Sequence, residues 1–247
     1  MNNLWKYIII ATSVVLAAIV LSTAYTQRYR SMTGTITVTG LGETEFTSDL
    51  IVIEGRVEVE NYDAAEGYNN LEASRNKVID FLISKGVHRE AISFDMPYSS
   101  ELSTSIYENG NYMGMRFAGY EFSQSFSIES TDVDAVESAA RALPSLIAQG
   151  IDITVYNPMY YYSKLESVKL DLLAAAAADA RERALQIATN SGAALGNLAM
   201  SRAGVFQITA ATGDEEFSAG GSFNLSSREK KARVTVRAEY KIKPIKE

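Results

Sequence analysis

The sequence contains no cysteine and only one histidine, His88, among its 247 residues. The absence of thiols excludes disulfides, thiolate nucleophiles and cysteine-ligated zinc or iron–sulfur centres. A Ser-His-Asp site would have to use His88, which follows Gly86 just past an expected helix end without any nucleophile motif. We therefore expect His88 to be a solvated loop residue, with a catalytic histidine as the alternative.

The sequence also has little that favours nucleic acid, cofactor or metal binding. The net charge is −7 with acids and bases interspersed, so no basic patch would attract a phosphate backbone. It contains no Gly-rich phosphate loop, H-E-x-x-H or G-x-S-x-G motif. With 30 carboxylates some acid pair is inevitable, and Glu215-Glu216 lies in an expected mobile loop. We predict no catalytic, cofactor-binding or metal-ligating residues, and a carboxylate-based hydrolase is the least favoured function.

Charge is absent from the N-terminal segment between Tyr7 and Gln27. Its apolar part, Tyr7 to Tyr25, has 19 residues, about 28 Å as a helix, which approaches the thickness of a bilayer core. We predict that residues 1–30 are a transmembrane anchor, and the flanking charges leave its orientation open. The alternative is a secretory signal cleaved near Ala24, after the small residues of Ser22-Thr23-Ala24.

Strand patterns are clear in the rest of the chain. Apolar and polar residues alternate in 35–42, 50–60, 120–129 and 233–243. The last segment is the most regular, with Val234, Val236, Ala238, Tyr240 and Ile242 on its inward face. Such alternation predicts antiparallel or mixed sheets with one face in water.

Three helices are expected near 63–85, 132–149 and 164–191. Asp63 and Glu66 have capping-box spacing at the start of the first, and Pro144 should kink or divide the second. Each helix is followed by a glycine that suits a left-handed C-terminal cap, and then by a strand pattern; these glycines are Gly86, Gly150 and Gly192.

Five consecutive alanines occupy 174–178 of the third helix. Charged residues on both sides exclude a membrane span, and the helix propensity of alanine excludes a disordered linker. What remains is a helix whose small side chains allow close approach to a sheet. We predict a buried stripe that consists of Leu173, Ala177, Ala180, Ala184 and Ile187.

Two further segments raise the possibility of binding. Residues 211–229 read as a long loop, in which Phe217, Phe223 and Leu225 hint at contact with a partner subunit. Tyrosines gather in 156–163 and nearby, at Tyr98, Tyr107, Tyr112 and Tyr120. We favour half-buried strand residues at a sheet edge or subunit interface. The alternative is an aromatic platform for a sugar or peptide that includes Tyr160 and Tyr162.

The order of several segments resembles that of the SIMPL domain, a bacterial envelope family. They are "ITVTGLGETEFTSDLIVIEGRVEVE", "GYEFSQSFSI", "AAAADARERALQIATNSGAALG" and "RVTVRAEYKI", which together extend over about residues 34–243. One departure is Ser48-Asp49, where the family usually has Pro-Asp at a turn. The alanine-rich helix carries the strongest part of the resemblance.

The resemblance implies an α+β fold in which antiparallel and mixed sheets pack with three helices. An outer β-α subdomain, about 34–104 and 163–243, would hold an inserted plait-like subdomain of about 105–162. It also implies an extracytoplasmic, periplasmic location and no established catalytic residues, and some relatives form large oligomers or are linked to envelope stress. We expect a membrane-tethered, non-enzymatic homo-oligomer with an envelope protein or glycan as a further partner. The alternative is a monomeric binding module for envelope glycan or peptide that uses the tyrosines.

Overall fold

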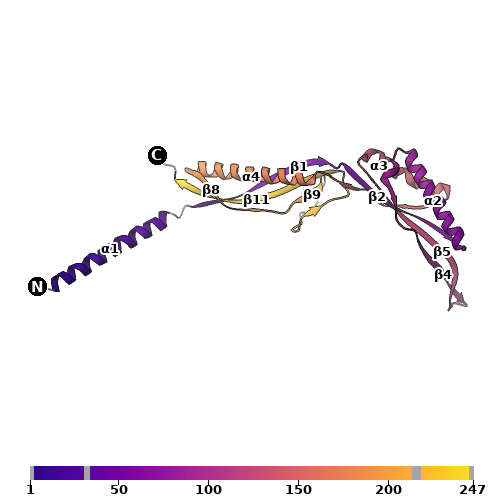
Figure 1. Ribbon diagram of the computed structural model, residues 1–247, viewed down its shortest axis with the longest axis horizontal. Coiled ribbons are helices and arrows are strands. Elements are labelled where there is room, and N and C mark those ends of the chain that lie inside the picture. Colours follow the sequence, from indigo (N-terminus) through magenta and orange to yellow (C-terminus); the bar gives the residue numbers. More distant parts are fainter. Residues whose placement is uncertain (1–2, 31–33, 213–217, 245–247) are drawn as a thin grey trace. The chain divides into compact units, whose positions relative to one another are not determined.

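The computed structural model of the protein describes residues 3–30, 34–212 and 218–244, which form a mixed α+β structure (Figure 1). The described residues contain four α-helices, one more than the three expected to pack on the sheets: α1 (Asn3–Arg30), α2 (Ala64–Ser84), α3 (Val133–Ala142) and α4 (Leu165–Asn190). Two 3-10 helices, η1 (Arg89–Ala91) and η2 (Leu143–Gln149), accompany them. The strands are β1 (Thr35–Thr47), β2 (Leu50–Asn61), β3 (Ile92–Phe94), β4 (Tyr98–Glu108), β5 (Asn111–Ser130), β6 (Asp152–Val155), β7 (Met159–Tyr161), β8 (Ala193–Ala203), β9 (Gln207–Ala210), β10 (Ser222–Phe223) and β11 (Glu229–Pro244).

The chain divides into two compact units. Unit 1 comprises Met1–Glu43, Leu170–Val205 and Arg233–Glu247, and unit 2 comprises Thr44–Lys169 and Phe206–Ala232. The expected insertion at 105–162 lies within the larger first segment of unit 2. Its expected start falls inside β4, which pairs with β5, and residues 120–130 of β5 in turn pair with β2. Those ladders join residues 50–61 and 98–130 in one sheet.

In unit 1, helix α4 packs on one face of a sheet in which β1 and β8 both pair with β11 (Figure 1). The side chains of α4 that are buried are Leu172, Ala176, Ala180, Ala184 and Ala188. The predicted stripe was therefore partly wrong, since Ala177 is exposed and Ile187 is 47 % exposed. Rows of residues four apart run obliquely to a helix axis, so this stripe follows an inclined line across a twisted sheet.

Unit 2 is built on a six-stranded sheet with the order β3-β5-β2-β6, to which β4 adds by pairing with β5 and β7 by pairing with β2. Helices α2 and α3 contribute to a single core with this sheet. Its largest fully buried side chains include Ile51, Ile53, Leu71, Phe126 and Leu143. The alternation expected for residues 50–60 and 120–129 is thus confirmed, with odd residues of β2 and even residues of β5 facing the helices.

The helices begin and end where the capping residues and Pro144 predict. Asp63 caps α2 by accepting a hydrogen bond from the backbone N–H of Glu66 at 2.9 Å. Gly86, Gly150 and Gly192 all have positive φ, as a left-handed cap requires. The predicted effect of Pro144 is confirmed, because α3 ends at Ala142 and the chain continues as the 3-10 helix η2.

The N-terminal segment is helical from Asn3 to Arg30, and apolar side chains such as Leu16 and Val20 are exposed on it. Among the residues that the structure describes, no helix combines the length and the apolar character needed to cross a membrane. The predicted transmembrane span is therefore not confirmed.

Candidate interaction surface

The residues singled out for chemistry do not come together. His88 is exposed and precedes η1, where its side chain makes no capping hydrogen bond. It lines a shallow recess with Ser93 and Ser127, whose hydroxyl oxygens lie 2.7 Å from each other. Glu215-Glu216 and Phe217 lie outside the described residues. Within the described part of the chain, no group of three or more histidine or acidic side chains could hold a metal ion.

Tyr160 belongs to the core of unit 2. Burial, the negative charge of Glu137 and a hydrogen bond with that side chain raise the pKa of the Tyr160 phenol. Glu137 also pairs with Arg141, and Arg228 pairs with Asp134 at 2.5 Å. Tyr160 is therefore a strand residue packed in the core, as in the favoured interpretation, and its burial does not support the alternative of an aromatic platform that includes it.

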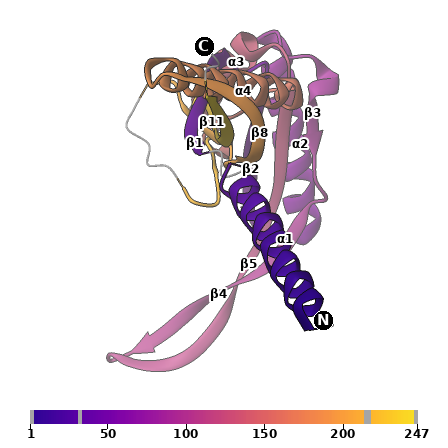
Figure 2. The same ribbon diagram turned by 90° about the vertical axis from the view of Figure 1, so that its left-hand side faces the viewer.

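Several exposed aromatic side chains of unit 2, among them Tyr107 and Tyr112, lie instead on the hairpin formed by β4 and β5. Figure 2 shows these two strands leaving the rest of the unit as a two-stranded ribbon, which we name the β4–β5 arm (residues 98–120). Asn109 and Gly110 join the strands with φ values of 51° and 81°. Positive φ at both positions is typical of a type I′ turn, which suits the twist of a hairpin.

A row of apolar side chains runs along one face of this arm. Phe117, Met115 and Tyr112 of β5 lie directly opposite Ser103, Ser105 and Tyr107 of β4. These β4 residues alternate along the strand, so their partners share one face despite the two register shifts in β5. We define the aromatic row as Tyr107, Tyr112, Met115, Phe117, Tyr120 and Phe122.

The aromatic row begins in the core and ends in solvent. Phe122 is buried against Gly67 of α2, where an added Cβ would lie 2.3 Å from the phenyl ring. Ring contacts continue outward from Phe122 to Tyr120 and from Tyr120 to Phe117, with centroid distances of 6.2 and 5.1 Å. The side chains of the row that lie beyond the start of α2 are no longer covered by the rest of unit 2. Met115 is 63 % exposed and Tyr112 is 57 % exposed.

The arm carries little charge, with only Glu101, Glu108 and Arg116 between residues 98 and 120. An uncovered row of aromatic and methionine side chains on a nearly uncharged ribbon suits contact with another apolar surface. It does not resemble a catalytic site, because no titratable groups converge there. We therefore identify the aromatic row as the candidate interaction surface.

The sequence points to the tyrosines, but its pattern does not predict the surface that they form with Met115 and Phe117. Tyr107 and Tyr112 lie near Tyr98 and Tyr120 in the sequence, but residues 98–108 show no alternation that would predict a strand. The contribution of Met115 and Phe117 depends on a register shift between Leu102 and Ser103. The Asn-Gly dipeptide at 109–110 was the sequence signal that could have indicated the hairpin.

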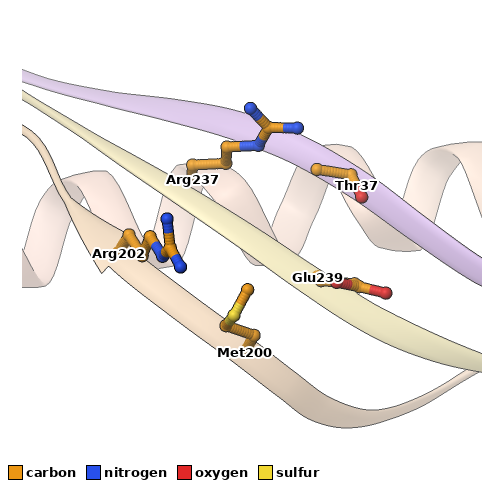
Figure 3. Close-up of a pocket in the computed structure, with 5 residues that line it drawn as sticks. All are labelled: Thr37, Met200, Arg202, Arg237 and Glu239. Carbon is orange, nitrogen blue, oxygen red and sulfur yellow. The ribbon is translucent and has the colours of Figure 1, made fainter.

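A second feature lies on unit 1, on the open face of the sheet opposite α4. Thr37, Met200, Arg202, Arg237 and Glu239 line a recess of about 240 Å³ there (Figure 3). The two arginines come from neighbouring strands, β8 and β11, and lie directly opposite each other in the register. The recess collects positive charge but contains no nucleophile paired with a base.

Comparison with known proteins agrees with the order of the segments. The family described as "SIMPL: Protein of unknown function (DUF541)" matches residues 36–240. No curated protein matches the chain.

Proposed function

Because this chain belongs to the SIMPL family, we propose that it is an extracytoplasmic envelope protein that acts without catalysis, through assembly with further copies or binding to a partner. The observation that carries the proposal is the aromatic row of the β4–β5 arm. Isolated two-stranded hairpins are at best marginally stable in water, so an extended apolar ribbon calls for a partner.

The exposed area of the aromatic row limits how large an interface it can form. Tyr107, Tyr112, Met115 and Phe117 are between 43 and 66 % exposed. With about 200 Å² for each side chain, they would bury on the order of 450 Å² per copy. Two copies would then bury less than the roughly 1,200–2,000 Å² of a stable interface. The arm therefore supplies an apolar contact that needs a second contact to form a stable assembly.

The N-terminal segment serves in this proposal either as an uncleaved tether that holds the protein at the membrane or as an export signal that is removed. The uncharged run between Tyr7 and Gln27 supports both, and the exposed apolar side chains of α1 would be covered by lipid in the first case. Membrane fractionation of the native protein with mass spectrometry of its N-terminus separates the two. An intact terminus in the membrane fraction supports a tether, and a terminus after Ala24 supports a signal. A cytoplasmic protein with an intact terminus contradicts both.

Cysteine trapping tests self-association through the arm. The chain has no cysteine, so Met115→Cys introduces a single thiol on the aromatic row. If two arms meet, the full-length variant forms a disulfide-linked dimer under mild oxidation. Met96→Cys is the matched control, because Met96 is 91 % exposed and lies outside the aromatic row. Equal dimer yields from the two variants would contradict contact through the arm.

A second candidate function, binding of envelope glycan or peptide, is favoured by the exposed rings of Tyr107 and Tyr112, whose centroids lie 5.8 Å apart. Aromatic faces of this kind can cover the apolar face of a sugar or a peptide side chain. Tyrosine fluorescence of the full chain, titrated with peptidoglycan fragments, tests it. A saturable change that Tyr107→Ala and Tyr112→Ala remove supports binding, and a change that persists in that double variant contradicts it.

A further inference from the structure

Unit 1 has an open sheet face that concentrates positive charge. The inward residues of β11, such as Ala238 and Tyr240, pack against α4, so the alternate residues face away from it. We define the basic face by the outward cations Arg202, Arg237, Lys241 and Lys243, among which Glu239 is the acid. Arg233 and Glu43, also outward, pair with each other.

Two like charges lie opposite each other at the centre of this face. Arg237 and Arg202 are a directly paired position of the β11–β8 ladder, and like charges at such positions destabilise a sheet. Within the described residues neither arginine forms an ion pair or a hydrogen bond through its side chain. Figure 3 shows the carboxylate of Glu239 directed away from both guanidinium groups. The fold thus holds an uncompensated pair of cations in front of an open recess.

Unit 2 has an open sheet face with the opposite charge. Val57 of β2 is buried toward the helices, so Glu58 and Glu60 face the other way. Glu60 lies directly opposite Glu121 of β5, and Glu58 lies directly opposite Asp152 of β6. We define the acidic face by these outward carboxylates and their neighbours: Glu54, Glu58, Glu60, Glu121, Glu129 and Asp152.

Strand β2 also places one basic residue, Arg56, on the acidic face. Its guanidinium forms an ion pair with the carboxylate of Glu58 at 3.2 Å. Glu60, Glu121 and Asp152 form no ion pair within the described part of the chain. The acidic face therefore repeats, with inverted sign, the unfavourable like-charge pairing of the basic face.

We propose that the basic face of one copy of this chain binds the acidic face of a second copy. The inference rests on the proposed assembly function and supplies the second contact that the small area of the aromatic row requires. The two faces carry opposite charges, so a second copy of the chain is the partner that fits each of them. The charge of each face would relieve the like-charge repulsion within the other. The contact is heterologous, because each copy would offer a basic face to one neighbour and an acidic face to another. Repetition gives a closed ring or an open filament.

Charge reversal with mixing tests this contact in the full-length chain. Variant one carries Arg202→Glu and Arg237→Glu, and variant two carries Glu60→Lys and Glu121→Lys. Each variant, taken alone, places like charges across the contact. We therefore expect the dissociation constant for self-association, measured by sedimentation velocity, to rise by at least about tenfold. In an equimolar mixture, the intact acidic face of variant one meets the intact basic face of variant two, and association returns.

The control carries the charge change of variant one away from both faces, as Lys77→Glu with Arg181→Glu on exposed positions of α2 and α4. It should associate like the wild type. If variant one fails to fold by circular dichroism, Lys241→Glu with Lys243→Glu replaces it, since both side chains are exposed.

The outcomes separate this inference from the proposed function. Reversed variants that associate like the control, while the wild type assembles, overturn the charged contact and leave assembly intact. Folded variants that each fail alone and also fail when mixed overturn it as well, because the faces would then not meet between copies. A wild type that stays monomeric at every concentration overturns this inference together with the proposal that the protein assembles with further copies.

Discussion

Ala180 marks the closest approach between α4 and the sheet of unit 1. Its side chain is fully buried. Across from it, a Cβ added to Gly40 would lie 2.2 Å from the carbonyl oxygen of Ala176 and 2.4 Å from the Ala180 nitrogen. Glycine on the strand and alanine on the helix therefore let two backbones touch, and neither position has space for a larger side chain.

Ala180→Leu should destabilise the protein by roughly 1–3 kcal/mol, because the added atoms must displace backbone rather than a flexible side chain. Urea unfolding followed by circular dichroism measures the change. Ala178→Leu makes the same substitution on an exposed position of α4 and should have little effect. Equal losses for the two variants would show that the buried stripe does not set the close approach.

Asp179 provides a pH-dependent link between α4 and β1. Its carboxylate accepts hydrogen bonds from the Arg183 guanidinium at 2.9 Å and from the Leu41 backbone N–H at 2.8 Å. These contacts, that of Arg183 first, lower the pKa of Asp179 below its ordinary value.

A lowered carboxyl pKa stabilises the fold above the unfolded-state pKa of about 3.9, and this stabilisation is lost as pH falls through the lower folded-state pKa. The free energy of unfolding should therefore fall less steeply between about pH 5 and pH 2 in Asp179→Asn than in the wild type. Urea unfolding at several pH values checks this. Parallel pH profiles for the two proteins would contradict the assignment.

At the scale of elements, the hairpin turn at Asn109-Gly110 offers a clean test of the β4–β5 arm. Gly110 has φ of 81° and no neighbouring atom within 4 Å of an added Cβ, so a substitution there acts through backbone strain alone. Gly110→Ala should cost about 1 kcal/mol and speed amide hydrogen exchange in the arm. Gly220→Ala, at an open position without a positive φ, is the control. Unchanged exchange in the arm of Gly110→Ala would contradict the turn.

Elements with one buried face were predictable from the sequence, and the arm was not. Residues 233–243 alternate because Val234 and Val236 are buried while Thr235 and Arg237 are exposed to water. In β4, both faces of the strand are largely exposed, and five of its eleven residues are serine or threonine. No alternation arises where no face is buried, so the strand left no periodic signal.

The candidate site was predictable only in part for a related reason. The charges of the basic and acidic faces look like ordinary solvated residues along each strand. Their meaning comes from register, which brings Arg202 opposite Arg237 and Glu60 opposite Glu121 across strands far apart in sequence. The buried position of Tyr160 likewise depends on its pairing with Ile51 and its contact with Glu137.

At the scale of the whole molecule, the chain has an apolar arm on unit 2 and charged sheet faces of opposite sign on its two units. An assembly that uses the charged faces should respond to salt, because screening shortens the reach of exposed charges to about 8 Å near 0.15 M and about 3 Å at 1 M. The dissociation constant of the wild type should therefore rise with sodium chloride. Met115→Ser should keep this salt dependence while it weakens association, and loss of the salt response in that variant would contradict separate contacts.

Sedimentation velocity of the full-length chain over a range of concentrations tests the central claim most directly. The account predicts that the average mass rises with concentration above that of one chain, and that Met115→Ser shifts this rise to higher concentration while Met96→Ser does not. A single species with the mass of one chain, at every concentration and at low salt, would contradict it.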